Sequence, residues 1–504
     1  MAGDLRGHLV AYFEEQHKLV EAGALQLLLA APQPLVISRE VVERVGPSSP
    51  IVTREIVAAA LAERLTGRAV PAPPTLAAAA DPAIRRTPSA RFELVREGFA
   101  GPPVATQPIA AYAALFQSRY RALARLLRGR PQLGNLRPIR ELRATEGDAS
   151  VIGMVREVRE TPQRHHLILT LDDESGSVEL LVPKDSAGSR ISFLPDEVVG
   201  ARLQFAKEPG KIPRVVAIER PDVPHARSVG RAPDAHRAIF LSDLHVGSRS
   251  FLSEPWAELV AFLREEGPYP ELARSIDHVV IAGDLVDGIG IYPRQERDLA
   301  IPDVVEQYAE LARRLGELPG RLTIVGVPGN HDAVCPAEPQ PALPAGLADG
   351  LPSNVRILAN PSTFALDGVV IEAYHGRSFD DLIPAIPGAS YAHPTEVMKR
   401  MLQCRHLAPI YGDRTPLAPL PYDGLVIDPV PDILVTGHVH TYGVDRYRQV
   451  LLLNASTWQA ETEYQRMRNI APVPAHTAVV DLATLALVSL DFAHGPPVVV
   501  EVGG

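Results

Sequence analysis

His278-Val-Val-Ile-Ala-Gly-Asp-Leu-Val-Asp287 places two carboxylates directly after a short apolar run that is rich in β-branched residues. Such a run predicts a buried strand, and the glycine that follows it predicts where the strand ends. In layered α/β proteins, ligands bind just outside the carboxyl ends of the strands, where the connecting loops converge. The stretch therefore predicts a site that Asp284 and Asp287 enter from one strand end.

The same arrangement, an apolar run followed at once by side chains that bind metals, occurs four more times. Residues 238–241 precede Asp243 and His245, residues 322–327 precede Asn330, His331 and Asp332, residues 369–374 precede His375, and residues 433–436 precede His438 and His440. Each motif alone is weak evidence, because a lone histidine at a strand end is more often structural than a ligand. Five such strand ends together predict one pocket of carboxylates, imidazoles and an amide.

This mixture of oxygen and nitrogen donors suits Mn²⁺, Fe²⁺ or Zn²⁺ better than Ca²⁺ or Mg²⁺. Two such ions about 3.5–4 Å apart hold a phosphate between them and stabilise the attacking and leaving oxygens. The donor set therefore predicts a metal-dependent phosphoesterase. The two cysteines, Cys335 and Cys404, are too few for a disulfide framework or a cysteine-based zinc site.

The composition is that of an ordinary globular protein, since 46% of the 504 residues are apolar and 22% are charged. This length predicts two to four domains. No run of 18 apolar residues and no signal-peptide pattern is found, so we expect a cytoplasmic protein without a membrane span. The net charge of −10 argues against broad, non-specific nucleic-acid binding, although a local basic groove remains compatible with it.

Patterns along the chain predict four parts. Residues 1–70 have short helical periodicities, with Thr53 as an N-cap, and residues 71–108 form a Pro/Ala-rich linker. Residues 109–220 begin with an amphipathic helix and continue as five short β-type runs, which predict a small barrel, most simply an OB-fold. Residues 237–504 alternate apolar strands with helical segments, as in an α/β domain.

An OB-fold either binds single strands or docks a partner. Base-stacking platforms use aromatic side chains, and this segment offers few of them, namely Phe193 and Phe205. Docking is therefore the favoured interpretation of the barrel.

The motifs Asp-x-His, Gly-Asp-x-x-Asp, Gly-Asn-His-Asp, His and Gly-His-x-His, in this order over residues 237–460, resemble those of calcineurin-like metallophosphoesterases. The resemblance implies a phosphoesterase β-sandwich with flanking helices. It implies one metal held by Asp243, His245 and His440, a second held by Asn330, His375 and His438, and Asp284 bridging them. It also implies His331 as the catalytic imidazole and Asp332 as the residue that orients it, with loop capping as the alternative role of Asp332 and Asp287.

Longer stretches resemble the small-subunit family of archaeal family D DNA polymerases. They include Phe240-Leu-Ser-Asp-Leu-His-Val-Gly-Ser248, Gly283-Asp-Leu-Val-Asp-Gly-Ile-Gly-Ile-Tyr-Pro293 and Tyr374-His-Gly-Arg-Ser-Phe-Asp-Asp381. This resemblance implies a 3′→5′ exonuclease that proofreads beside a large polymerase subunit, with Mn²⁺ as the working ion. A single-stranded primer 3′ end would be the substrate.

Three residues directly after ligand loops, Arg249, Tyr292 and Arg377, are candidates for substrate contact, with surface packing as the alternative. Two other functions stay open. A free-standing phosphoesterase or nuclease would explain the site but not the barrel and the helices before it. A non-catalytic scaffold subunit would dock the large chain without cleaving DNA.

Overall fold

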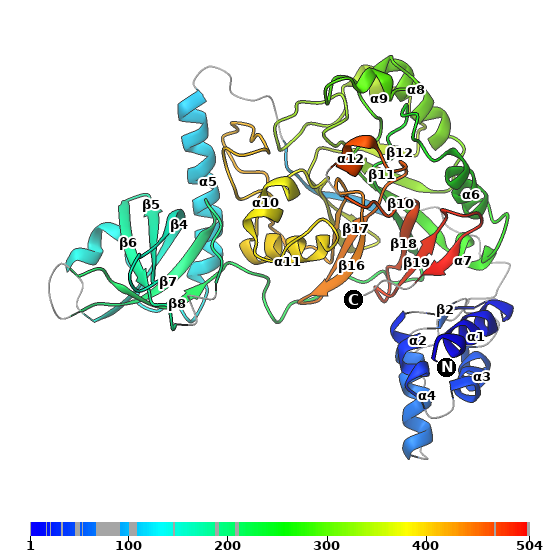
Figure 1. Ribbon diagram of the computed structural model, residues 1–504, viewed down its shortest axis with the longest axis horizontal. Coiled ribbons are helices and arrows are strands. Elements are labelled where there is room, and N and C mark those ends of the chain that lie inside the picture. The colour runs from blue at the N-terminus through cyan, green and yellow to red at the C-terminus, as the bar shows by residue number, and fades with distance from the viewer. Residues whose placement is uncertain are drawn as a thin grey trace.

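The computed structural model describes residues 2–16, 18–20, 22–31, 34–45, 51–52, 54–66, 91–99, 108–144, 147–186, 191–206, 211–467 and 470–500. They form a small helical part, a β-barrel and a large part built from two sheets (Figure 1). Among these residues, no helix has both the length and the apolar character needed to cross a membrane.

The two-sheet part contains a seven-stranded and a six-stranded sheet. The first has the order β12 (Val355–Ile357), β11 (Thr323–Val327), β10 (Ile276–Ala282), β9 (Arg237–Leu241), β18 (His476–Asp481), β19 (Leu487–Asp491) and β20 (Val498–Val500). The second has the order β16 (Tyr442–Tyr447), β17 (Val450–Ala455), β15 (Ile433–Thr436), β14 (Val369–Ala373), β13 (Ser362–Leu366) and β3 (Phe92–Glu97). Strands β9 to β12 are parallel neighbours, and so are β14, β15 and β17.

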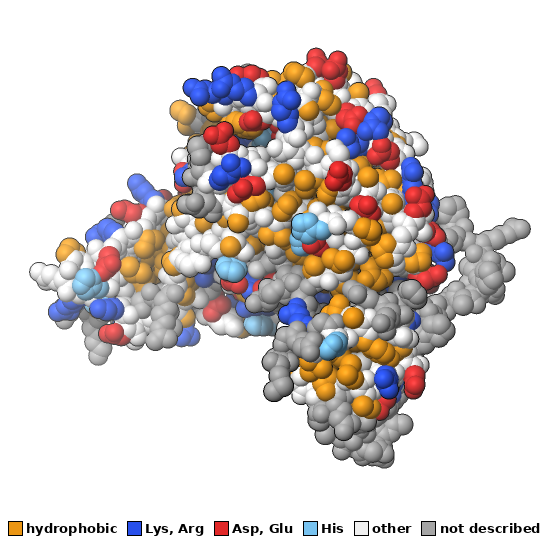
Figure 2. Space-filling view, turned by 45° about the vertical axis from the view of Figure 1, so that its right-hand side comes forward, with side chains coloured by type: hydrophobic (Ala, Val, Ile, Leu, Met, Phe, Trp, Pro, Cys, Tyr) orange, Lys and Arg blue, Asp and Glu red, His pale blue; other side chains and the backbone are white. Residues whose placement is uncertain are grey.

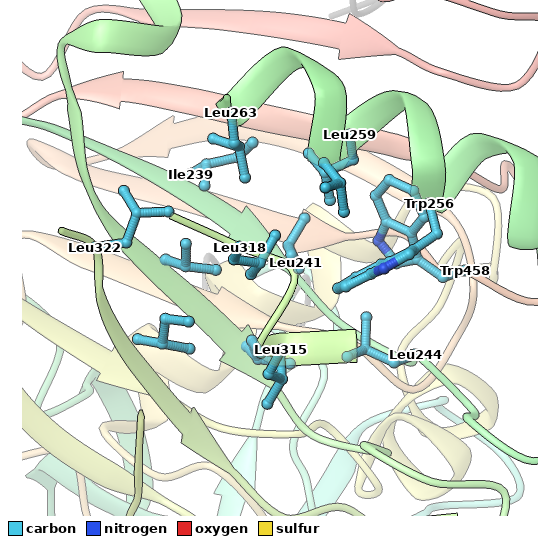
Figure 3. Close-up of a cluster of buried hydrophobic side chains, with 14 of the residues drawn as sticks. Ile239, Leu241, Leu244, Trp256, Leu259, Leu263, Leu315, Leu318, Leu322 and Trp458 are labelled. Atoms are coloured by element: carbon cyan, nitrogen blue, oxygen red, sulfur yellow. The ribbon is translucent and has the colours of Figure 1, made fainter. Parts of the chain in front are cut away.

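Apolar side chains fill the space between the sheets and cover both outer faces. Phe240 of β9 and Phe364 of β13 belong to the core between the sheets. On the outer face of the first sheet, Leu241 packs with Trp256 and Leu259 (Figure 3). Strands covered on both faces have continuous apolar sequences rather than alternating ones, which is why the sequence shows such runs. The expected α/β sandwich with flanking helices is confirmed.

The flanking helices are short and mostly follow a strand. They are α6 (Ser253–Leu263), α7 (Pro270–Arg274), η3 (Gln295–Arg297), α8 (Val304–Leu315), α9 (Ala345–Ala348), α10 (Phe379–Ala385), α11 (Pro394–Cys404) and α12 (Glu463–Met467). Residues of α6 and α8 pack on the first sheet, and residues of α10 and α11 pack on the second.

Strand β3 comes from the segment 71–108 that was expected to be a linker. It pairs antiparallel with β13, with Phe92 opposite Leu366 and Glu97 opposite Ser362. The linker prediction therefore does not hold for these six residues. The surrounding prolines and alanines masked a short β-type run, Phe92-Glu-Leu-Val-Arg-Glu97, in the sequence. Residues 71–90 and 100–107, which hold the proline clusters, lie outside the described residues.

A closed five-stranded barrel follows the long helix α5 (Pro108–Arg128) and the turn η1 (Ile139–Ala144). Its strands are β4 (Asp148–Glu160), β5 (Leu167–Asp173), β6 (Gly176–Val182), β7 (Val198–Gln204) and β8 (Arg214–Glu219), in the order β4-β5-β6-β8-β7. The predicted barrel is thus present, and its assignment to the OB-fold class stays an interpretation.

The N-terminal part contains four helices and a two-stranded parallel pair. They are α1 (Ala2–Glu15), β1 (Leu19–Val20), α2 (Ala22–Leu29), α3 (Pro34–Val45), β2 (Ile51–Val52) and α4 (Arg54–Thr66). Leu9, Phe13 and Leu28 lie in its own apolar core, so the expected helical unit is present. Thr53, the expected N-cap of α4, lies outside the described residues.

Buried ion pairs join α5 and the barrel to the two-sheet part. Nε of Arg119, which is fully buried on α5, donates to Oδ2 of Asp423 at 2.6 Å, and His406 Nε2 lies 2.9 Å from the same oxygen. Glu197, just before β7, pairs with Arg400 of α11 at 3.2 Å. Removing one partner of such a pair leaves an uncompensated buried charge, so these contacts fix the barrel in place.

The histidine of this junction gives the protein a pH-dependent stability. Burial lowers the pKa of His406 to about 4, and the charge of Arg119 adds to this effect. An unfolded histidine titrates near pH 6.5, which is about where the stability from neutral His406 begins to be lost as the pH falls. We predict that His406→Gln flattens the decline in the free energy of unfolding between about pH 6.5 and about pH 4.5, measured by urea denaturation.

The matched control is His165→Gln, because the His165 side chain on the barrel is 59% exposed. This variant should keep the parent slope. If His406→Gln also kept it, the buried histidine would not be the titrating group.

Candidate metal centre

Every predicted ligand lies on a loop directly after a strand of the sandwich. Asp243 and His245 follow β9, Asp284 follows β10, Asn330 follows β11, His375 follows β14, and His438 and His440 follow β15. Three of these strands belong to the first sheet and two to the second. Both sheets therefore deliver side chains to one site.

The backbone is left-handed at five of these residues. The φ angles of Asp243, His245, Asp284, His438 and His440 are 50°, 49°, 47°, 69° and 57°. This conformation costs about 1–3 kcal/mol at a residue with a side chain, and it persists only where the surrounding structure enforces it. Its concentration here indicates a functional site rather than ordinary loops.

The first donor group consists of Asp243, His245 and His440. Nε2 of His440 lies 3.1 Å from Nε2 of His245 and 3.3 Å from Oδ1 of Asp243. All three residues are buried, and Oδ1 of Asp243 makes no hydrogen bond of normal geometry with any described residue. A buried carboxylate oxygen without a partner is costly, so this oxygen fits the role of a cation ligand.

The second donor group consists of Asp284, His375 and Asn330. Oδ2 of Asp284 lies 3.3 Å from Nε2 of His375, which is 3.1 Å from Oδ1 of Asn330. The same Oδ2 atom lies 3.7 Å from Nε2 of His245 in the first group. Asp284 thus stands between the two groups, as a bridging ligand must.

Hydrogen bonds on the far side of two rings leave their Nε2 atoms suited to metal binding. Nδ1 of His375 donates to the carbonyl of Ala282 at 2.9 Å, because a carbonyl can only accept. Nδ1 of His245 lies 3.0 Å from Oδ1 of Asp287. Metal-binding histidines commonly use such a partner to fix the tautomer and the ring orientation.

The charges of the site are mutually stabilising. Burial alone would raise the pKa of Asp243, but the neighbouring rings of His245 and His440 lower it well below the usual range. Burial opposes protonation of His375, yet the charge of Asp284 raises the pKa of this ring to about 9. Two buried carboxylates therefore call for positive charge, which divalent cations would supply.

The group that orients His331 is Asp287, and not Asp332 as the sequence predicted. Nδ1 of His331 donates to the Asp287 carbonyl at 2.7 Å, so Nε2 faces Asp284 Oδ2 at 4.0 Å. Asp332 accepts from the backbone N–H of Gly329 at 2.8 Å and from Tyr308 Oη–H at 2.8 Å. Asp332 therefore caps the loop that carries Asn330 and His331, which was the alternative role.

Three side chains that support the ligands were not predicted from the sequence. Oδ2 of Asp380 lies 3.3 Å from Nε2 of His438, and Nε2 of Gln465 lies 2.6 Å from Nδ1 of His440. Gln459 donates to Oδ1 of Asp287 at 3.0 Å. Asp380 belongs to the same sequence motif as the proposed ligand His375, so the motif could have indicated Asp380 as a supporting residue. The two glutamines come after β17 in the chain and carry no signal of their own.

The three candidates for substrate contact lie on the loops around the site, where each already has a protein partner. Nε of Arg249 donates to the Arg297 carbonyl at 3.1 Å, and Nη1 of Arg377 donates to the Pro336 carbonyl at 2.8 Å. The Tyr292 hydroxyl donates to Asp298 at 3.0 Å. Their contact with substrate stays a prediction.

Comparisons with known proteins agree on one family. The family model for the B subunits of DNA polymerases alpha and epsilon matches residues 238–444. The DNA polymerase II small subunit of Archaeoglobus fulgidus is 43% identical over 367 residues, which is 72% of this chain and 73% of that protein. The protein of the same name from Methanothermobacter thermautotrophicus is 40% identical over 379 residues, 74% of this chain and 78% of that protein.

Among solved structures, Vacuolar Protein Sorting 29 from Cryptosporidium parvum is 18% identical, with a TM-score of 0.28, and the match covers 54% of this chain and 97% of that one. Vps29 from Entamoeba histolytica, complexed with Zn²⁺, is 15% identical, with a TM-score of 0.28, over 53% of this chain and 98% of that one.

The two-sheet fold and its donor groups define a protein of the metallophosphoesterase-like class. Within that class, the chain belongs to the family of archaeal DNA polymerase II small subunits. The resemblance recognised in the motifs is thereby confirmed.

The shared position of Asp284 gives a test of the metal centre. We predict that Asp284→Ala lowers the divalent metal bound per chain from about two equivalents to nearly none, because one carboxylate serves both donor groups. Elemental analysis after dialysis measures this. The control is Asp349→Asn, at an exposed residue after α9, which should keep the parent content. Two equivalents retained by Asp284→Ala would contradict the bridging role.

Proposed function

We propose that this chain is a two-metal 3′→5′ exonuclease that hydrolyses the terminal phosphodiester of a primer strand as the small subunit of a DNA polymerase. The observation that carries the proposal is the buried Asp284 carboxylate, which lies between two donor groups with Nε2 of His331 4.0 Å away. Membership of a polymerase subunit family supports DNA as the substrate. A polymerase holds the primer 3′ end, so a nuclease attached to it would lie close to that end.

The first metal would be held by Asp243, His245 and His440, and the second by Asn330, His375 and His438, with Asp284 shared between them. The ring centres of His375 and His438 lie 5.2 Å apart. Mn²⁺ is our proposed working ion, because mixed carboxylate and imidazole donors suit it, as they do Fe²⁺ and Zn²⁺. Two such ions would polarise the phosphate and stabilise both the attacking and the leaving oxygens.

His331 would act on the leaving 3′ oxygen. The Asp287 carbonyl holds the proton on Nδ1, so Nε2 is the atom that can carry a second proton into the site. Burial lowers the pKa of His331, although the charge of Asp284 opposes this, so a proton on Nε2 is readily given up. Mispaired ends leave the duplex more easily than paired ends, which would give selectivity without reading the base.

Docking to a large subunit would complete the enzyme, since the relatives are named as small subunits. Acidic and basic side chains are interspersed over the face that Figure 2 shows, and the net charge is −10. Such a surface attracts DNA weakly by itself, which fits a subunit that obtains its DNA affinity from a partner. The barrel, fixed by buried ion pairs, would be part of the docking surface.

Substitution of the catalytic imidazole tests the proposed activity. We predict that His331→Ala lowers the rate of 3′-end digestion with Mn²⁺ by about 10²–10⁴-fold, because general acid catalysis contributes that much. The metal content should stay at the parent value, since His331 belongs to neither proposed ligand set. Digestion of a labelled, mismatched primer measures the rate.

The matched control is His393→Ala, at an exposed histidine before α11, which should digest the primer at the parent rate. Undiminished digestion by pure His331→Ala would overturn the proposed activity.

A further inference from the structure

A short loop, residues 288–291, lies directly against the backbone of His331, the proposed catalytic residue. It begins after Asp287, whose carbonyl accepts from Nδ1 of His331. Gly288 packs so closely on the backbone of His331 that a Cβ there would collide with the His331 carbonyl oxygen. We call these four residues, Gly-Ile-Gly-Ile, the isoleucine loop.

Two buried glutamines hold the ends of the isoleucine loop. Gln307 of α8 accepts from the Gly288 N–H at 2.8 Å and donates to the Gly288 carbonyl at 3.2 Å. Gln295 accepts from the Ile291 N–H at 2.9 Å and donates to the Asp287 carbonyl at 2.7 Å. Side chains on a loop held at both ends keep their positions relative to His331.

The loop nevertheless presents two large apolar side chains to solvent. Ile289 is 50% exposed and Ile291 is 38% exposed. Single exposed apolar residues need no explanation, but two of them on one fixed loop beside a polar site form a small apolar contact surface. The helix η3, which follows the loop in the chain, holds Arg249, because Nε of Arg249 donates to the carbonyl of Arg297 at 3.1 Å.

We propose that Ile289 and Ile291 contact the nucleobase next to the scissile phosphate of an unpaired strand. This inference rests on the proposed function. Because the loop packs on the His331 backbone, a strand whose phosphate reaches Nε2 of His331 would place an adjacent nucleoside near the isoleucine loop. Nucleobase faces are largely apolar, and proteins use isoleucine and leucine as wedges against them. Arg249 offers positive charge to the neighbouring phosphate.

The test compares the full-length Ile289→Ser/Ile291→Ser variant with the parent on three probes. They are a single-stranded oligonucleotide, the same oligonucleotide with abasic residues at its last two positions, and the small diester bis(p-nitrophenyl) phosphate. We expect kcat/KM on the normal strand to fall about tenfold, the scale of one base contact. Replacing the last two bases by abasic residues should lower kcat/KM of the parent by a similar factor. The same replacement should hardly change kcat/KM of the variant. Hydrolysis of the small diester should be unchanged.

One control variant and the contradicting outcomes make the test decisive. Val498→Ser changes an apolar residue of similar exposure (47%) on the edge strand β20 and should behave as the parent. Equal losses on the strand and the small diester, or no loss on the strand, would overturn the inference. So would weakened binding to the large subunit without a change towards DNA, because a protein would then cover the isoleucines.

Binding of the labelled oligonucleotide, followed by fluorescence anisotropy, distinguishes this inference from the proposed function. If the parent bound but did not digest DNA, and the isoleucine variant bound about tenfold more weakly, the nucleobase contact would stand and the exonuclease proposal would fail.

Discussion

Two carboxylates, Asp243 and Asp284, are buried at the edge of a β-sandwich, with the imidazoles of His245, His375 and His440 close to them. Such charges are expensive in a dry interior unless cations or hydrogen bonds compensate them. Asp284 is compensated by the rings of His245 and His375, whereas one oxygen of Asp243 has no hydrogen bond of normal geometry to a described residue. This buried oxygen without a hydrogen bond is the feature that makes the site a metal centre in our account.

The rest of the two-sheet part brings these charges together and keeps them there. Parallel strands from two sheets end at the site, and apolar layers on both faces of each sheet hold the strands in register. The left-handed backbone at five ligands shows that packing, rather than local preference, sets their positions. Support from Asp287, which holds the rings of His245 and His331 through different atoms, extends this rigidity to the proposed catalytic group.

Much of this could be predicted because the site is built from local signals. An apolar run that ends at a charged motif indicates both a strand and the direction in which its end points, so the candidate side chains at the five strand ends could be named from the pattern. The choice of seven proposed ligands among them came from the resemblance to metallophosphoesterases. The partners of those ligands could not be named, because Gln459 and Gln465 meet the site through tertiary packing alone. The role of Asp332 also depends on tertiary packing, since its bond to Tyr308 comes from the preceding helix α8 folding back onto the loop. Strand β3 was missed because its only β signal is six residues long and its partner lies far along the chain.

The most direct test of the central claim is anomalous X-ray diffraction from crystals of the full-length chain grown with Mn²⁺. Our account predicts two anomalous peaks about 3.5–4 Å apart, one on each side of the Asp284 carboxylate. One of them should lie within reach of Asp243, His245 and His440, and the other within reach of Asn330, His375 and His438. A map without peaks at this carboxylate, or with a single peak that Asp284 does not touch, would contradict the account.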